Sequence, residues 1–177
     1  MIFYMTSFRK ATPEDFDSCW QLIDEARWKM IRDGRCQWTS DYPSPDIIRH
    51  DIDQGHAFVI ENEGKITTYG VIAINAEPAY SQPSAHWLSH GDYFVIHRLA
   101  VSVDERGRGW GHRFIEETER HSRQRGVNSI KIDTNYDNTQ MLSMMKSMGY
   151  TACGEIDYGD KGMRLAFEKL LTDDPKP

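Results

Sequence analysis

Several features that mark whole classes of protein are scarce in this sequence of 177 residues. Its three cysteines, Cys19, Cys36 and Cys153, are widely spaced and odd in number, so neither a disulfide framework nor a CxxC metal site is expected. No apolar run approaches the roughly 20 residues of a membrane span, and the opening segment lacks the apolar core of a signal peptide. We therefore expect a cytoplasmic protein that does not associate with membranes.

Positive charge is also scarce. The 21 Lys and Arg residues face 27 Asp and Glu residues, a formal net charge of −6. Proteins that bind nucleic acid usually present a basic surface, so we expect no nucleic-acid partner. The aromatic content of 11% argues against a disordered chain. The length is near that of a typical domain and predicts one domain over residues 1–177, with a disordered tail at 172–177.

Hydrophobic periodicity and turn signals predict a mixed α/β domain. Thr12 before Pro13 and Ser44 before Pro45 are typical of helix starts. The expected strands are 7–10, 56–61, 66–76, 92–103, 129–134, 150–158 and 162–170, and the expected further helices are 107–125 and 138–148. The order of elements is therefore β-α-α-β-β-β-α-β-α-β-β.

The most informative segment is LAVSVDERGRGWG, residues 99–111. An apolar strand leads into a turn with three glycines at alternate positions, and the turn leads into a helix. Glycines allow the backbone to approach a ligand closely, and a helix start offers unpaired N–H groups to an anion. Arg106 and Arg108 add positive charge suited to phosphate. The segment predicts a pyrophosphate-binding loop.

Other glycine-rich loops fit the segment less well. A Walker loop requires GK[ST] after its glycines, whereas Trp110-Gly111-His112 follows here. A dinucleotide-binding loop belongs to the first βα unit of a parallel sheet, but this one follows four expected strands. A nucleotide-binding domain and a helix start that binds nothing stay open on the glycine pattern alone.

A second motif lies downstream. The run Arg106-x-x-Gly109-x-Gly111 after a Leu-Ala-Val strand resembles the acetyl-coenzyme A loop of the GCN5-related N-acetyltransferase (GNAT) superfamily. The segment 138–150, NTQMLSMMKSMGY, resembles its Asn-x-x-Ala…Tyr-x-x-x-Gly-Phe helix. The order of elements also matches that superfamily from about Ser7 to Leu170.

The resemblance implies a central, mostly antiparallel sheet with splayed fourth and fifth strands, flanked by about four helices. It implies acetyl-CoA as co-substrate and no metal. The residues that it assigns to the cofactor are Leu99, Val101, Val103, Arg106, Gly107, Arg108, Gly109, Trp110, Gly111 and, for the pantetheine, Asn138. It also allows a homodimer.

The implied reaction is direct transfer of the acetyl group to a primary amine of a small molecule or a peptide N-terminus. The amine must lose a proton, for which the general base is Asp133 or His97. Asp133 lies on a strand five residues before Asn138. Regular alternation would put His97 on the same face of its strand as Leu99. Either residue can instead have only a structural role.

The acid of the superfamily is often a tyrosine, but Met145 stands at the matching position and cannot donate a proton. Tyr136, Tyr158, a water or no acid at all stay open. The departure leaves a non-catalytic acyl-CoA-binding module as the alternative function.

The acceptor side is marked by aromatic residues. Trp38 and Tyr42 lie between the first two expected helices, a region that borders the acceptor site in the superfamily. A polar loop at 77–91 could close over the same site. Packing on the sheet is an equally good explanation of these aromatic side chains.

Overall fold

We describe residues 6–172 of a computed structural model. The chain forms two compact units. The first comprises residues up to Ile72 together with His97–Glu117, and the second comprises Ala73–Ile96 together with the chain from Thr118 onward. Strands β3 (Lys65–Ile74) and β4 (Phe94–Val101) and helix α3 (Trp110–Gln124) each run from one unit into the other.

The first unit contains strands β1 (Ser7–Lys10) and β2 (Ala57–Asn62) and helices α1 (Phe16–Arg32) and α2 (Pro45–Asp53). Strand β2 pairs antiparallel with both β1 and β3. The predicted start of α2 is confirmed, because Ser44 Oγ accepts a hydrogen bond from Ile47 N at 3.4 Å. Buried residues of both helices pack on β2 and β3 and form one core, which includes Cys19, Leu22, Ile23, Ala26, Ile48, Ile52, Val59, Tyr69 and Val71.

The first half of α3 is fixed on β3 by a close approach. A Cβ atom built on Gly70 would lie 2.5 Å from the ring of Phe114, so only glycine leaves room for that ring. Phe114 also meets Phe8 edge to face, with ring centroids 5.5 Å apart. The start of α3 is therefore held at a defined place on the first unit.

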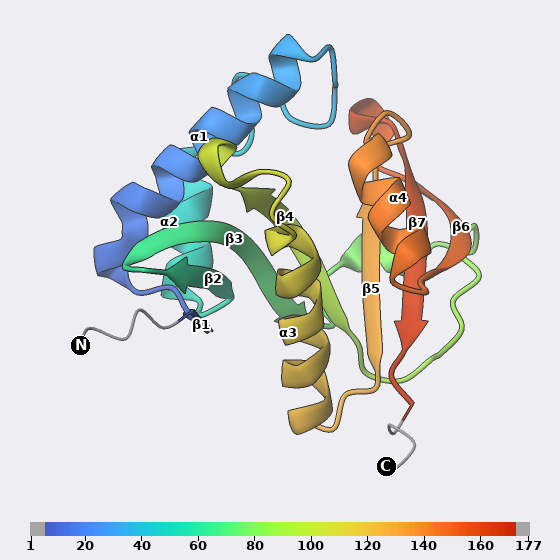
Figure 1. The fold of residues 1–177 in the computed structure, drawn as a ribbon. Coiled ribbons are helices and arrows are strands. Elements are labelled where there is room, and N and C mark those ends of the chain that lie inside the picture. The colour runs from blue at the N-terminus through green and yellow to red at the C-terminus, as the bar shows by residue number, and fades with distance from the viewer. Residues whose placement is uncertain (1–5, 173–177) are drawn as a thin grey trace. The chain divides into compact units, whose positions relative to one another are not determined.

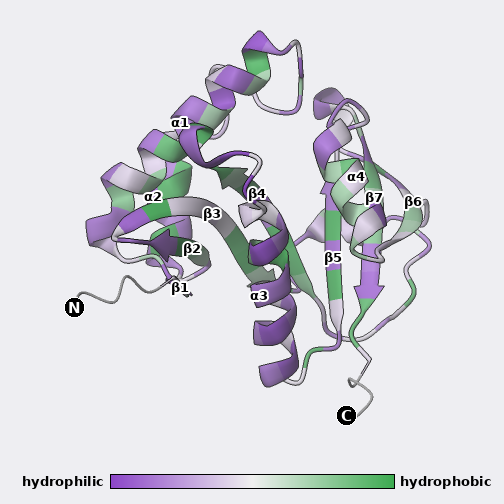
Figure 2. Ribbon diagram, in the orientation of Figure 1, coloured by the Kyte–Doolittle hydropathy of each residue, from purple (hydrophilic) through white to green (hydrophobic). Residues whose placement is uncertain are grey.

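The second unit contains β5 (Ser129–Thr134), α4 (Thr139–Ser147), β6 (Thr151–Asp157) and β7 (Met163–Leu170). Strand β7 pairs antiparallel with β5 on one side and β6 on the other (Figure 1). Hydrophobic residues concentrate along these strands, whereas α3 carries mostly hydrophilic residues (Figure 2). The core of this unit is built from Ala73, Tyr80, Val95, Cys153, Ile156 and Ala166.

The order of the strands is β1-β2-β3-β4-β5-β7-β6. Strands β4 and β5 are parallel, and their ladder holds only two pairs, Phe94↔Ile130 and Val95↔Lys131. Such a short ladder is expected of strands that splay apart. The α/β fold and the element order expected from the sequence are thus confirmed, and the 3₁₀ turns at 78–81 and 103–105 are additions to them. Of the predicted disordered tail, residues 173–177 lie outside the described part of the chain.

Candidate active site

The second half of β4 carries three of the predicted site residues, His97, Leu99 and Val101. All three are partly buried in the first unit. Between His97 and Leu99, the backbone of Arg98 is left-handed, with a φ of +50°. The regular alternation used to place His97 and Leu99 on one face therefore does not hold, because a left-handed residue interrupts the extended strand.

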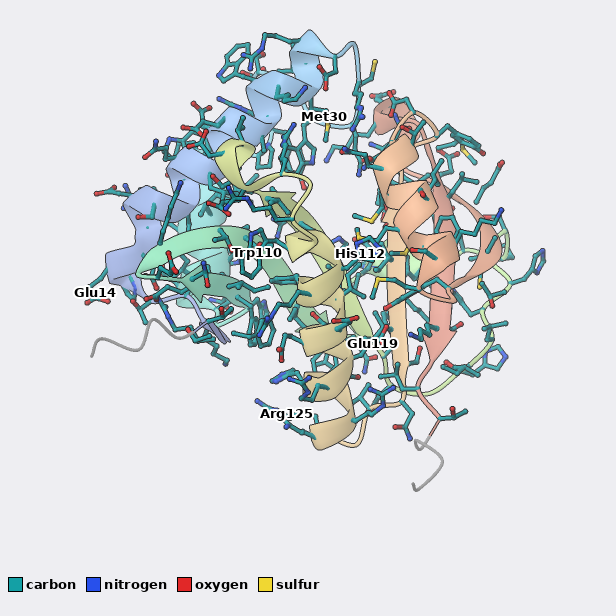
Figure 3. The ribbon with its side chains drawn as sticks, in the orientation of Figure 1. Glu14, Met30, Trp110, His112, Glu119 and Arg125 are labelled. Atoms are coloured by element: carbon teal, nitrogen blue, oxygen red, sulfur yellow. The ribbon has the colours of Figure 1, made fainter. Side chains whose placement is uncertain are left out.

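The glycine loop follows in the same unit. It runs from the 3₁₀ turn Val103–Glu105 to Trp110, the first residue of α3 (Figure 3). Gly107 and Gly109 have φ values of +76° and +81°, and a Cβ atom built on either would meet nothing within 4 Å. The glycines therefore serve the backbone conformation and leave the space beside the loop open. An open backbone next to a helix start is the geometry that binds phosphate.

Charges in the loop are partly paired with one another. Glu105 accepts hydrogen bonds from Arg108 Nη1 and from Trp110 Nε1, both at 3.1 Å. The sequence analysis did not single out Glu105, although its spacing to Arg108 allows this ion pair. Arg106 is partly buried, and burial lowers its pKa while the nearby Asp33 opposes that shift.

The two aromatic residues predicted on the acceptor side differ in their surroundings. Trp38 is 6% exposed and belongs to the core of the first unit, so its packing role is established. Tyr42 is partly buried, and its hydroxyl accepts a hydrogen bond from Arg98 Nη1 at 3.1 Å. Arg27 also fixes their loop, because its Nη1 donates to the carbonyl of Ser40 at 2.6 Å.

The second unit holds Asp133, on β5. Its Oδ2 accepts hydrogen bonds from the hydroxyl groups of Tyr80 and Tyr158, each at 2.8 Å. Its Oδ1 accepts none from any residue in the described part of the chain. Burial, reinforced by the charge of Asp133, raises the pKa of both tyrosines, so both are protonated donors at neutral pH. The carboxylate is thus held through one oxygen and open at the other.

Asn138 has a structural role in this unit. It is the N-cap of α4: its Oδ1 accepts from Met141 N at 3.3 Å, and its Nδ2 donates to Thr134 Oγ1 at 3.1 Å. The motif that suggested a pantetheine contact therefore also starts a helix. Binding of pantetheine by Asn138 stays a prediction.

The loop at 77–91 is attached to β6. Gln82 Nε2 donates to the carbonyl of Asp157 and Ser84 Oγ to that of Glu155, both at 2.8 Å. Trp87 Nε1 donates to the carbonyl of Tyr80 at 2.8 Å. These contacts hold the loop within the second unit and bring Tyr80 to Asp133.

The predicted site residues thus fall into two sets. The first unit contains His97, the glycine loop and Tyr42, and the second contains Asp133 and Asn138. No helix within residues 6–172 is long and apolar enough to span a membrane. Within the same range, no three His, Cys, Asp or Glu side chains are grouped so as to hold a metal ion.

A family model agrees with these observations. The model of the acetyltransferase (GNAT) family matches residues 14–150. The chain belongs to this family. It is therefore an acyltransferase, and acetyl-CoA is the acetyl donor that the GNAT family uses.

Individual proteins are also similar to most of the chain. An uncharacterized N-acetyltransferase of Bacillus subtilis (strain 168), YesJ, is 28% identical over 153 residues, which are 85% of this chain and 82% of that protein. A GNAT-family acetyltransferase structure from Streptococcus agalactiae 2603 is 29% identical, with a TM-score of 0.85, and the match covers 98% of this chain and all of that one. The NatC complex bound to Gag peptide and CoA has a chain that is 16% identical, with a TM-score of 0.67 and coverage of 94% and 99%. At this level of identity, the similarity to the NatC chain shows a shared fold and nothing more.

The missing GNAT tyrosine has a structural explanation here. Met145, at the matching position, is fully buried in α4 and is therefore a core residue. Of the tyrosines considered as substitutes, Tyr136 is exposed and donates its hydroxyl to Glu155, and Tyr158 donates to Asp133.

Proposed function

We propose that this GNAT protein transfers the acetyl group of acetyl-CoA to a primary amine of a small molecule or of a peptide N-terminus. An ammonium group must lose a proton before it can attack a thioester. The observation that carries the proposal is the carboxylate of Asp133, which two tyrosine hydroxyls hold through Oδ2 while Oδ1 is left without a hydrogen bond from the described residues.

In this proposal Asp133 is the general base, and Oδ1 accepts the proton of the amine. Tyr80 and Tyr158 keep the carboxylate in one orientation, which a general base requires. His97 is the alternative base. Its neighbour Arg98 has a left-handed backbone that interrupts the strand at this point, and an imidazole nitrogen can accept a proton from an amine.

The glycine loop is proposed to bind the pyrophosphate of acetyl-CoA. The open space beside Gly107 and Gly109 would accept the phosphates, and the first N–H groups of α3 would donate to them. Arg106 and Arg108 would balance their charge. To bind a phosphate, the guanidinium of Arg108 would have to give up its hydrogen bond to Glu105, because the carboxylate and the phosphate would compete for the same donor. Leu99, Val101 and Val103 would line the pantetheine arm.

No dedicated acid is proposed. Tyr158 already donates its proton to Asp133, and its raised pKa makes it a weak acid. A thiol has an ordinary pKa of about 8.5, so a thiolate can leave without prior protonation near neutral pH. The absence of the GNAT tyrosine at Met145 is therefore compatible with catalysis, and family membership favours an enzyme over the non-catalytic binding module.

Three further attributes belong to the same proposal. Free thiols, among them the buried Cys19 and Cys153, support a reducing cytoplasmic location. The extent of the family match supports one functional domain over residues 1–177. The net charge of −6 favours cationic amines as acceptors, and a homodimer is expected only by analogy with the family.

The test is acetyl transfer from acetyl-CoA to a panel of polyamines, aminoglycosides, amino acids and peptides with free N-termini. Release of free CoA thiol is measured by a colorimetric reagent, and the acetylated product is identified by mass. We expect amine-dependent thiol release with at least one class. Binding of acetyl-CoA without transfer to any class would favour the non-catalytic module.

A further inference from the structure

One strand residue has a backbone conformation that its side chain does not favour. Three non-glycine residues among those described have a positive φ: Glu63, Asn75 and Arg98. Glu63 and Asn75 lie in connections outside the strand interiors, where a positive φ is common. Arg98 alone lies inside a strand, β4, with a φ of +50°. The left-handed region is unfavourable for a residue with a Cβ by roughly five- to thirtyfold in population.

The side chain of Arg98 is held by two other residues of the first unit, and a third residue supports one of these two. Its Nε and Nη2 donate to Oδ2 and Oδ1 of Asp51 at 2.8 and 2.6 Å, a bidentate ion pair with α2. Its Nη1 donates to the hydroxyl of Tyr42 at 3.1 Å, in the loop between α1 and α2. Tyr69 of β3 donates its hydroxyl to Asp51 Oδ2 at 2.9 Å. We call Arg98, Asp51, Tyr42 and Tyr69 the Arg98 cluster.

The cluster is shielded from solvent to a large extent. The side chain of Arg98 is 16% exposed and that of Asp51 is 5% exposed. Burial alone would lower the pKa of Arg98, but the hydrogen bonds and charge of Asp51 raise it overall, so the guanidinium is charged. A bidentate pair in such surroundings fixes the direction of both side chains. Three bonds to the guanidinium can hold a backbone conformation that is unfavourable by itself.

The position of the left-handed residue in β4 connects the Arg98 cluster to the proposed function. Arg98 stands between His97, a candidate base, and Leu99, a proposed cofactor contact. A left-handed residue redirects the backbone N–H and carbonyl groups around it, and such irregularities recur where a strand meets a ligand. Asp51 and Tyr42, which are far from β4 in the sequence, thereby act on the conformation of a strand that carries site residues.

We propose that Arg98 is a positioning residue: Asp51 and Tyr42 anchor its side chain and thereby hold β4 in the left-handed conformation required for acetyl-CoA binding and turnover. The proposal rests on the proposed function, because it assumes that the second half of β4 binds the donor. It assigns no contact with substrate to Arg98 itself.

The test compares two double variants, Asp51→Asn with Arg98→Gly and Asp51→Asn with Arg98→Ala. Both remove the ion pair, and neither leaves an unpaired buried carboxylate. They differ by one Cβ atom, and glycine reaches the left-handed region readily whereas alanine does not. We expect the glycine variant to keep an acetyl-CoA affinity and a kcat/KM at least about five times higher than the alanine variant. Equal values in two folded variants would overturn the proposal.

A matched control separates this effect from the loss of any ion-pair network. Arg9 on β1 donates to Asp15 and Glu61 in a comparable cluster, but it has no left-handed backbone. Arg9→Ala should lower the melting temperature and leave acetyl-CoA affinity and kcat unchanged. An equal loss of affinity in Arg9→Ala would also contradict the proposal, since it would trace the effect to general destabilisation.

If a double variant does not fold, as judged by the lack of a cooperative unfolding transition, Arg98→Lys replaces it in the test. Lysine keeps the charge but cannot bond Asp51 and Tyr42 in the same forked geometry. We expect acetyl-CoA affinity to fall at least threefold, and an unchanged affinity would overturn the proposal. Affinity is measured by calorimetry without an acceptor. A failure of the acceptor screen with normal acetyl-CoA binding would therefore count against the proposed function and leave the role of Arg98 to be judged on binding alone.

Discussion

Gly109→Val tests the glycine loop in the most direct way. At a φ of +81° any residue with a Cβ is strained, and a β-branched residue more so. The built Cβ meets no atom within 4 Å, so the cost to the folded protein is backbone strain of about 1–2 kcal/mol and no steric clash. For a chain of this size that cost lowers the melting temperature by roughly 2–8 °C.

The effect of Gly109→Val on acetyl-CoA binding is separate from its effect on stability. The valine side chain would fill the open space in which we place the pyrophosphate, and we expect acetyl-CoA to bind at least tenfold more weakly, about 1.4 kcal/mol. Thermal shift measures both effects. At a concentration 100 times the wild-type dissociation constant, acetyl-CoA should stabilise the wild type by about 2.7 kcal/mol and the variant by about 1.4 kcal/mol or less.

Gly126→Val is the matched control. Gly126, after α3, has a φ of +70° and open space around its Cβ position, so the strain is similar but the loop is untouched. It should lower the melting temperature comparably and leave acetyl-CoA affinity unchanged. A folded Gly109→Val protein with wild-type affinity would refute the reasoning and move the phosphate site elsewhere.

Three other predictions concern the base, the cap and acid stability. Asp133→Asn should lower kcat by roughly 10²–10⁴-fold while acetyl-CoA affinity stays near wild type. His97→Gln should lower kcat by a smaller factor. If steady-state kinetics show the larger loss of kcat for His97→Gln, the histidine is the base. Asn138→Ala should raise the acetyl-CoA KM by about two- to tenfold, because one hydrogen bond to the pantetheine is lost. It should also lower the melting temperature, because the N-cap of α4 is lost. A lower melting temperature with an unchanged KM would mean that Asn138 only caps the helix. Hydrogen bonds from Arg9 lower the pKa of Asp15 to about 2, so the stability that this pair adds should be present above pH 4 and lost as the pH falls from about 4 toward 2. Acid titration followed by circular dichroism should show a shallower loss for Asp15→Asn, and identical curves would contradict that assignment.

Local signals explain what the sequence predicted well. The helix that begins at Pro45 depends on Ser44 and a neighbouring backbone N–H, and the glycine loop depends on residues that follow one another. Both are determined within a few residues, so spacing and residue type suffice. Within the loop, the ion pair of Glu105 with Arg108 also lies at short range, and an (i, i+3) pair of opposite charge could have indicated it.

The environment of Asp133 could not be predicted in this way. Its partners Tyr80 and Tyr158 are 53 and 25 residues away along the chain. Their meeting depends on how the loop at 77–91 attaches to β6, which no local pattern encodes. The sequence placed Asp133 on a strand near Asn138 but gave no indication that two tyrosines orient its carboxylate.

The left-handed conformation of Arg98 is a second such case. Arginine has no intrinsic preference for this conformation, and the β-branched residues around it predict a regular strand. The conformation follows from the packing of Asp51 and Tyr42, which are 47 and 56 residues away. Similarly, burial of Trp38 depends on the whole core of the first unit and could not be separated from an acceptor contact by sequence alone.

The central claim is that Asp133 supports acetyl transfer from acetyl-CoA to an amine. The most direct measurement follows free CoA thiol and acetylated amine together, by colorimetry and mass, for the wild type and for Asp133→Asn with the best acceptor of the panel. The account predicts equal amounts of the two products from the wild type. It also predicts a rate at least about a hundredfold lower from a folded variant that still binds acetyl-CoA. Equal rates from the two proteins, or thiol release without acetylated amine, would contradict it.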